Sequence, residues 1–299
     1  MERDIFGSSS VEDFFKFMGE RHEIWRRRDA GYERPWTEDP ILHEYKFTNV
    51  FRELDRGTIA LRQMEEKWVD IWDEERKKTE IDWTVAGLIV FNTFWYRMLN
   101  LDVHAKHVGF LVASPDDLFY YLRRRYRDGK QIYTGAHMTN GGDPTTPKHE
   151  AHIPVFQAVW DERNELAQRI YESRSLAVAF KEIIPFRYSG PFISYEIVSD
   201  LRWSLMFEVD DVYTWANLGP GCKRGLTRLG LDRSVTAMTM LWARAKTALP
   251  PNLRGHFPNA EGTEQWPPFE LREIEHCLCE FDKYERVRLG QGKMRSRYQ

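Results

Sequence analysis

Three polar side chains recur at helical spacing early in the chain, within the stretch PWTEDPILHEYKFTNVFRELDR at residues 35–56. Asn49, Arg52 and Arg56 are three and four residues apart, so on a helix they would share one face. Guanidinium and amide groups on one face supply the hydrogen-bond donors that a phosphate-handling site needs. An ordinary solvated helix face has the same pattern, and both interpretations stay open at this point.

Two glycine turns farther along the chain are also suited to binding phosphate. Gly190 lies between two apolar stretches, which is the pattern of a helix-hairpin-helix, where backbone N–H groups approach a nucleic-acid phosphate. Gly219 and Gly221 lie in a second turn, which opens onto a helix that carries Lys223 and Arg224. Backbone donors, helix dipole and cations coincide there, so anion binding is favoured about as much as a purely structural turn.

Three further residues are candidates for acid–base catalysis. Asp211 precedes the second glycine turn, and Asp282 and Lys283 lie close to Glu280, Tyr284 and Arg286 near the end of the chain. A carboxylate beside a hairpin is where DNA glycosylases of the helix-hairpin-helix class keep their catalytic acid, although a solvated helix cap would use Asp211 equally well. Asp282 and Lys283 fit either a proton-transfer cluster or an exposed ion-pair face.

The composition limits the classes of function. The chain has 299 residues, of which 42% are hydrophobic and 14% aromatic, as is typical of a globular protein with a large core. With a net charge of −3, any contact with nucleic acid must come from local patches. Three cysteines, a charged N-terminus and apolar runs too short to span a bilayer indicate an intracellular protein with no membrane association.

The sequence lacks the motifs that mark metal-binding and nucleotide-binding sites. His104 and His107 are three residues apart, as are His149 and His152, but no recognised motif fixes a third ligand, so we expect no metal. The sequence has neither the glycine-rich phosphate loop that ends in Lys-Ser/Thr nor the Rossmann glycine fingerprint. A self-contained ATP-dependent kinase is therefore disfavoured, and we expect no cofactor.

Helical periodicity dominates and predicts an all-α fold. The expected helices cover residues 11–28, 82–98, 115–127, 154–180, 192–206 and 269–289, with one helix or two in series at 47–77 and a broken helical stretch at 226–249. Residues 8–10, Asp82 and Ser114 are candidate caps at the starts of three of these helices. Residues 132–153 have the glycines and prolines of a loop, which contains Thr134 and Asn140 and is a place where chemistry can occur. No internal repeat or low-complexity linker divides the chain, so we expect one helical unit, residues 1–299, with approximate lobes at 1–153 and 154–299.

Six segments together resemble one protein family. They are ERHEIWRRR, PWTEDPILHEYKFTNVFRELDR, YTGAHMTNGG, SGPFISYEIVSDL, NLGPGCKRGL and EHCLCEFDKYERVR. In this order they resemble the α-glutamyl/putrescinyl thymine pyrophosphorylases, whose helical module also accompanies 5-hydroxymethyluracil DNA kinases. The resemblance covers nearly the whole chain and implies a helix-hairpin-helix, DNA-glycosylase-like helical architecture.

The role of that family implies a reaction on the DNA of a bacteriophage. A DNA kinase first converts 5-hydroxymethyluracil into its phosphate or pyrophosphate ester. An amine, such as an amino acid or a polyamine, then displaces that leaving group at the exocyclic methylene carbon, which requires a cation or acid for the phosphate and a base for the amine. The implied partners are DNA with phosphorylated 5-hydroxymethyluracil, the amine and the kinase, and the target base is expected to leave the stack.

The resemblance also assigns roles to the candidate site residues. They are Arg52, Arg56, Lys223 and Arg224 for phosphate, Asn49, Thr134 and Asn140 for the base or nucleophile, Asp55, Asp211, Asp282 and Lys283 for acid–base steps, and Gly190, Gly219 and Gly221 for DNA contact. His137 and Met138 stand where relatives are more apolar, which leaves the choice of amine open. Two other functions stay open: glycosylase-like excision of a modified base, and a non-catalytic module that docks a kinase on DNA.

Overall fold

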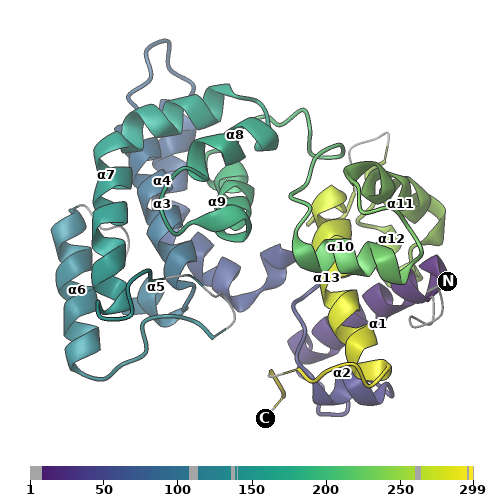
Figure 1. The fold of residues 1–299 in the computed structure, drawn as a ribbon. Coiled ribbons are helices and arrows are strands. Elements are labelled where there is room, and N and C mark those ends of the chain that lie inside the picture. The colour runs from purple at the N-terminus through teal and green to yellow at the C-terminus, as the bar shows by residue number, and fades with distance from the viewer. Residues whose placement is uncertain are drawn as a thin grey trace. The chain divides into compact units, whose positions relative to one another are not determined.

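The computed structural model describes residues 9–107, 114–135, 139, 141–259, 264–294 and 296–298. Every regular element within these residues is a helix, and the one extended pairing among them is an isolated antiparallel bridge between Tyr45 and Arg297 (Figure 1). The all-α prediction is therefore confirmed. In the same ranges, no helix combines the length and the apolar character needed to cross a membrane.

The helices form two compact units. The first unit combines Met1–Asp55 with Val212–Gln299, and the second unit is Arg56–Asp211. The chain thus leaves the first unit and later returns to it, so these units do not coincide with the expected lobes 1–153 and 154–299. The expectation of one helical unit over residues 1–299 stays a prediction.

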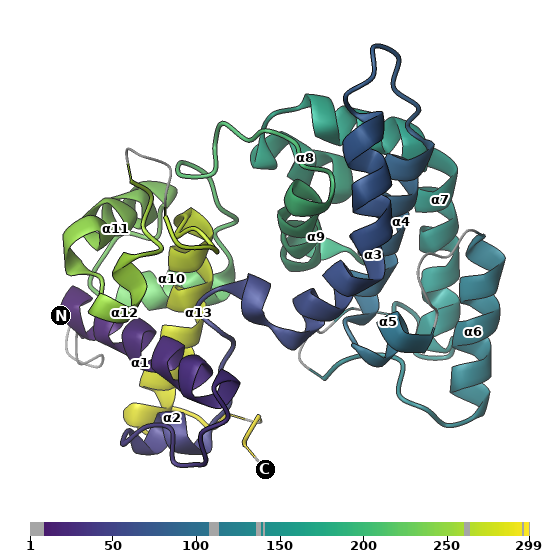
Figure 2. The same ribbon diagram turned by 180° about the vertical axis from the view of Figure 1, so that it is seen from behind.

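The first unit is built around its last helix. Its elements are α1 (Val11–Asp29), α2 (Pro40–Glu44), the 3-10 helix η1 (Arg52–Leu54), α10 (Pro220–Arg228), α11 (Val235–Ala248), α12 (Pro251–Arg254) and α13 (Leu271–Arg288). α1 starts where the sequence predicts, because the Ser10 hydroxyl accepts from the Asp13 N–H and the Asp13 carboxylate accepts from the Ser10 N–H. Phe14 and Phe17 of α1 pack on Phe281 of α13, with ring centroids 5.5 and 5.4 Å apart. α1, α10 and α11 all contact α13 (Figure 2).

The second unit encloses a nearly fully buried helix. Its elements are α3 (Arg56–Glu75), α4 (Thr84–Leu99), α5 (Val103–His107), α6 (Pro115–Arg127), α7 (Lys148–Glu172), α8 (Leu176–Ile183) and α9 (Gly190–Ser204). α4 contacts α3, α7 and α9. A buried ion pair joins α4 to α9, since Arg97 Nη2 lies 2.8 Å from Asp200 Oδ1 and the two side chains are only 1% and 4% exposed.

Two expected helices have different limits in the structure, and a third stretch is broken as predicted. The helix expected at 47–77 begins only at Arg56, and the residues before it form a non-helical segment and η1. The helix expected at 154–180 is two helices, α7 and α8, because the Ser175 hydroxyl caps a new helix by accepting from the Val178 N–H. The stretch at 226–249 is broken as expected, between α10 and α11, where Gly230 adopts φ +68° and Ser234 caps the next helix.

Glu65 makes the stability of the second unit depend on pH. Its carboxylate is fully buried and accepts from the hydroxyls of Thr93 (2.5 Å) and Ser204 (2.6 Å). Burial raises the pKa of Glu65 to about 7, which the hydrogen bonds from Ser204 and Thr93 only partly offset. The folded protein thus retains a proton that the unfolded chain releases between its ordinary pKa and about 7. Stability is therefore fully present at low pH and is lost as pH rises through this window.

We expect Glu65→Gln to remove this loss. Relative to the wild type, the variant should gain about 3 kcal/mol of unfolding free energy between pH 4.5 and pH 8. Urea denaturation of both proteins across that range measures the difference, in which contributions from other titrating groups cancel. Two parallel curves of stability against pH would show that Glu65 is already ionised in the folded protein.

Candidate functional site

The helix α13 buries an unusual number of ionisable side chains. They are Arg272, Glu273, Glu275, His276, Glu280, Asp282 and Glu285. Removing charges from water is costly unless each one has a partner. α13 therefore requires complementary groups from the elements that pack on it, and these groups define the candidate site.

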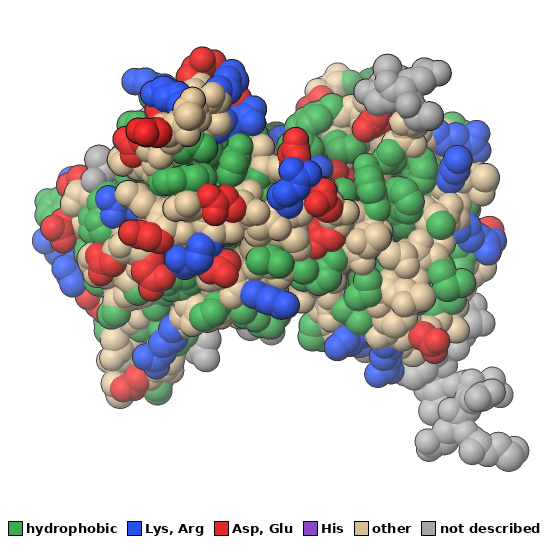
Figure 3. All heavy atoms as spheres, turned by 90° about the horizontal axis from the view of Figure 1, so that it is seen from above, with side chains coloured by type: hydrophobic (Ala, Val, Ile, Leu, Met, Phe, Trp, Pro, Cys, Tyr) green, Lys and Arg blue, Asp and Glu red, His purple; other side chains and the backbone are tan. Residues whose placement is uncertain are grey.

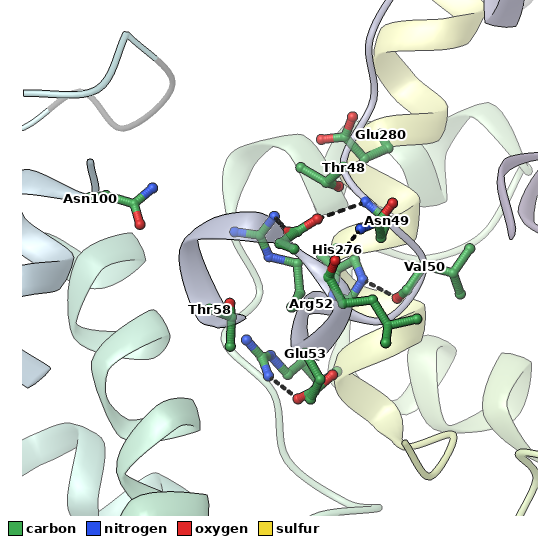
Figure 4. Close-up of polar contacts among 12 residues, drawn as sticks. Thr48, Asn49, Val50, Arg52, Glu53, Thr58, Asn100, His276 and Glu280 are labelled. Atoms are coloured by element: carbon green, nitrogen blue, oxygen red, sulfur yellow. Dashed lines mark hydrogen bonds and ion pairs between the residues drawn. The ribbon is translucent and has the colours of Figure 1, made fainter. Parts of the chain in front are cut away.

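The segment 48–55 supplies part of that complement (Figure 4). His276 Nε2 donates to the Val50 carbonyl oxygen at 2.6 Å, and Arg272 Nη1 lies 2.8 Å from Glu53 Oε1. Burial lowers the pKa of His276 well below its usual range, and the nearby Arg52 lowers it further, so this ring is neutral. From α1, the buried Arg21 donates to the Thr48 carbonyl oxygen at 2.5 Å.

Asn49, Arg52 and Asp55 contact one another, although not as one face of a helix. The Asn49 N–H donates to Asp55 Oδ1 at 3.1 Å, and the Asn49 side-chain amide donates to the Leu54 carbonyl oxygen at 2.8 Å. Arg52 forms an ion pair with Asp55 Oδ2. These contacts close a turn over residues 49–55, which explains why the helical conformation predicted for these residues is wrong. Asp55 thus engages both carboxylate oxygens in holding Asn49 and Arg52.

Lys283 of α13 forms an ion pair with Glu280, at 2.6 Å between Nζ and Oε1. Burial disfavours the charge on Lys283, but Glu280 outweighs burial and raises the pKa of the lysine. Burial likewise opposes ionisation of Glu280, and Lys283, Arg21 and Arg52 together lower its pKa. Lys283 is therefore a permanent cation at neutral pH, suited to binding an anion rather than to accepting a proton.

We call Arg21, Asn49, Arg52, Asp55, Glu280 and Lys283 the α13 cluster. The cluster holds three cations and two carboxylates, so one positive charge is in excess within a largely buried setting. The sequence named Asn49, Arg52, Asp55 and Lys283 as site residues and placed Glu280 beside Lys283, but it did not name Arg21. Glu280 had a signal in its spacing of three residues from Lys283, whereas Arg21 on the buried face of α1 had none.

Three other predicted residues, Arg56, Thr134 and Asn140, are not part of the α13 cluster as defined here. Arg56 belongs to the second unit, where its side chain is 83% exposed and pairs with Asp102 at 2.7 Å. Thr134 is also in the second unit, and its N–H donates to the Leu99 carbonyl oxygen at 2.9 Å. Asn140 lies outside the described residues, as do His137 and Met138. Their roles stay predictions.

The predicted DNA-contacting glycines have different surroundings. A Cβ on Gly221 would lie 2.3 Å from Cys279 Sγ, so this glycine permits α10 to pack closely on α13. Gly219 precedes α10 as its N-cap residue, with no side-chain cap. Gly190 starts α9 with φ +58° and open space around its Cα, which leaves its backbone accessible. DNA contact by these glycines stays a prediction.

Asp211 has a clear local function as a helix cap. Its carboxylate accepts from the N–H groups of Leu176 (2.8 Å) and Ala177 (3.1 Å) and from the Ser175 hydroxyl (2.7 Å). These donors are at the start of α8, where backbone N–H groups lack intrahelical partners. The contacts support the capping interpretation of Asp211 over the catalytic one.

We expect Asp211→Ala to lower the unfolding free energy by about 1–2 kcal/mol through loss of this cap. The neighbouring Asp210 offers a matched control, because its side chain is 71% exposed and pairs with Arg174 at 3.4 Å, so Asp210→Ala should change stability little. Urea denaturation measures both. A catalytic Asp211 would instead show unchanged stability and a large fall in turnover.

The histidine pairs also have structural partners. His104 lies 2.9 Å from the Tyr121 hydroxyl and 2.7 Å from the Ile132 carbonyl oxygen, and His152 Nδ1 lies 3.0 Å from the Tyr133 hydroxyl. Among the described residues, no group of three or more His, Cys, Asp or Glu side chains is arranged to hold a metal ion. These contacts account for the buried imidazoles as parts of hydrogen-bonded packing.

A groove of about 590 Å³ lies elsewhere in the first unit. It runs between α1 and the α11–α12 region, and its lining includes Glu12, Lys16, Glu20, Arg244 and Asn252. None of the predicted site residues lines this groove. The α13 cluster therefore remains the arrangement that best combines the predicted residues.

Comparison with known proteins agrees with one part of the resemblance. Residues 8–294 match the family described as 5-hmdU DNA kinase, helical domain. The chain is similar to the 5-hmdU DNA kinase of Bacillus phage SP10, with 26% identity over 301 residues that cover 93% of this chain and 45% of the relative. It thus spans less than half the length of that kinase, and no solved structure matches it. Because the family match covers almost all of the sequence, the chain belongs to the family of 5-hmdU DNA kinase helical domains.

Proposed function

We propose that this protein acts in the hypermodification of thymine in DNA, replacing phosphate or pyrophosphate on 5-(pyro)phosphomethyluracil with an amine. Membership of the 5-hmdU DNA kinase helical-domain family supports the pathway. The observation that carries the chemistry is the α13 cluster, in which Arg52 is held by Asp55 and Lys283 by Glu280, with a positive charge in excess. The resemblance to the thymine pyrophosphorylases supplies the class of reaction.

The proposed reaction is a substitution at the exocyclic methylene carbon. The amine nitrogen forms the new C–N bond, the C–O bond breaks, and its electron pair leaves with the phosphate. Arg52 and Lys283 stabilise the charge that develops on the departing group. Asp55 and Glu280 hold these two cations in place and are the carboxylates of the cluster that can accept the proton released by the amine.

The experiment is to incubate the protein with DNA that contains 5-phosphomethyluracil or its pyrophosphate and with a mixture of amino acids and polyamines. Digestion and nucleoside mass spectrometry should reveal a heavier, amine-bearing thymidine and identify the amine. Loss of the base, leaving an abasic site, would instead indicate glycosylase-like excision.

A second candidate function follows from the comparison with the phage kinase. Its match to this chain covers only 45% of the kinase, so the same helical module occurs there joined to further sequence. In this alternative, the protein presents DNA to a kinase and performs no substitution itself. DNA binding with an unchanged nucleoside on both phosphorylated substrates, together with faster phosphorylation of 5-hydroxymethyluracil by a partner kinase, would favour this function.

A further inference from the structure

Charged side chains of both signs are interspersed on the face shown in Figure 3, so an anion site on that face must be local. One such concentration lies where α10 packs on α13 in the first unit. The carboxylate of Asp282 is fully buried there, and three guanidinium groups approach it. Arg224 lies at 2.8 Å, Arg228 at 3.2 Å and Arg286 at 3.3 Å.

All three arginines approach Asp282 through Nε. Arg228 is itself buried and also donates through Nη1 to the Gln291 side chain at 2.7 Å. The side chains of Arg224 and Arg286 are 52% and 37% exposed. Arg224 Nε hydrogen-bonds the buried carboxylate, whereas Arg286 Nε faces it as an ion pair without a hydrogen bond. In both residues Nε is turned to Asp282, so the donors at Nη1 and Nη2 are available to a ligand.

More positive charge surrounds Asp282 than is needed to neutralise its carboxylate. One buried arginine would already compensate it, yet two further guanidinium groups share it, so the group carries an excess of two positive charges. The backbone beneath them is fixed, because a Cβ on Gly225 of α10 would lie 2.3 Å from the Leu278 carbonyl oxygen of α13. A rigid, partly exposed pair of guanidinium forks matches the bidentate geometry that phosphate favours.

We propose that Arg224 and Arg286 form a phosphate-binding site whose geometry is set by Asp282. Asp282 is then a positioning residue and not the acid–base group that the sequence predicted, and Arg286 is a phosphate contact that sequence reasoning missed. The phosphate belongs either to the backbone of a DNA strand or to a free phosphate or pyrophosphate. Its assignment to DNA rests on the proposed function.

Binding measurements on the full chain test the site. Fluorescence anisotropy with an unmodified thymidine-containing oligonucleotide, single-stranded and duplex, gives Kd at several salt concentrations. We expect Arg224→Ala and Arg286→Ala each to weaken DNA binding about three- to tenfold and to lower the slope of log Kd against log salt by about one. Arg244→Ala is the matched control, because Arg244 is 53% exposed in the same unit and pairs with a single exposed carboxylate, Glu12.

A competition arm separates the two sources of phosphate. Inorganic phosphate and pyrophosphate are titrated against bound DNA with the wild type and with both variants. Weaker DNA binding in the variants identifies a backbone phosphate, whereas unchanged DNA binding with loss of pyrophosphate competition identifies the free anion. Both results support the site. If neither property differs from that of Arg244→Ala, the proposal is overturned.

Asp282→Asn tests the positioning role of Asp282, because a positioning effect and a purely electrostatic effect change anion affinity in opposite directions. Asp282→Asn removes a negative charge, so a purely electrostatic effect would tighten binding of an anion. If Asp282 orients the guanidinium groups, binding should instead weaken, by about the same factor as in the arginine variants. Circular dichroism and thermal melting show whether Asp282→Asn is folded at the assay temperature, and tighter binding by a folded variant would remove the positioning role.

These outcomes are independent of the amine-transfer reaction. An unmodified oligonucleotide reports the phosphate site even if the wild type produces no modified thymidine, in which case the proposed function fails and the site stands. Conversely, variants that match Arg244→Ala in both arms while the wild type modifies DNA would refute the site and leave the proposed function intact.

Discussion

Gly225→Ala is expected to lower the unfolding free energy of the first unit by about 3 kcal/mol, the upper part of the range for overpacking a well-packed interior. The new Cβ would lie 2.3 Å from the carbonyl oxygen and 2.8 Å from the carbonyl carbon of Leu278. Those atoms are backbone and have no rotamer to change, so α10 must move away from α13. The displacement would also separate Arg224 and Arg228 from Asp282.

Helix propensity alone predicts that Gly225→Ala raises the unfolding free energy. The sign of the measured change therefore decides between propensity and overpacking. Within a helix, replacing glycine with alanine is otherwise favourable by about 1 kcal/mol. Gly292→Ala is the control in the same unit, because nothing lies within 4 Å of a Cβ at that position. Urea denaturation of both variants should show a large loss for Gly225→Ala and little change for Gly292→Ala. A stabilised Gly225→Ala protein would mean that α10 and α13 are farther apart than the structure places them.

Local signals in the sequence predicted much of the fold. Ser10 caps α1, and Ser114 caps α6 by accepting from the Asp116 N–H at 3.3 Å. The apolar run before Met98 forms the buried helix α4, and Asp82, two residues before its first residue, accepts from the Thr84 N–H at 2.9 Å. Each of these signals is contained in a few neighbouring residues. They can therefore be read without knowing what the helices pack against.

The segment before Arg56 could not be predicted in the same way. Its residues have the spacing of a helix, but Asp55 accepts from the Asn49 N–H and pairs with Arg52, and His276 binds the Val50 carbonyl oxygen from far along the chain. Side-chain and tertiary hydrogen bonds thus replace the helical ones. The pattern identified residues that belong together and assigned them the wrong backbone conformation.

The sequence grouped candidate residues that contact one another better than it assigned their partners. Asp282 and Lys283 are neighbours in sequence, and the sequence suggested one proton-transfer cluster for both. The structure gives them separate partners, since Asp282 contacts arginines of α10 and α13 whereas Lys283 pairs with Glu280. Adjacent residues on a helix point about 100° apart, so sequence neighbours at the centre of a packed unit face different elements. Only the packing around α13 could separate the two roles.

Arg52→Ala should lower turnover of the amine-transfer reaction about tenfold to a thousandfold, the range observed when one preorganised group that stabilises developing charge is removed. Arg52 is only 7% exposed and is held by Asp55, so its position is fixed before substrate arrives. Single-turnover kinetics on phosphorylated DNA measure the effect. The loss should appear in the rate of the chemical step more than in DNA affinity, because the charge on the leaving group develops in the transition state.

Two further variants separate charge from structure at this position. Arg52→Lys keeps the positive charge and loses the planar fork, so it should retain part of the rate while weakening the contact with Asp55. Arg26→Ala removes a 55% exposed arginine of the same unit that pairs with Glu23, and it should leave the rate unchanged. A folded Arg52→Ala protein with the rate of Arg26→Ala would exclude Arg52 from phosphate stabilisation. The cationic role in the α13 cluster would then fall to Lys283 and Arg21, whose contacts with Glu280 and with the Thr48 carbonyl do not depend on Arg52.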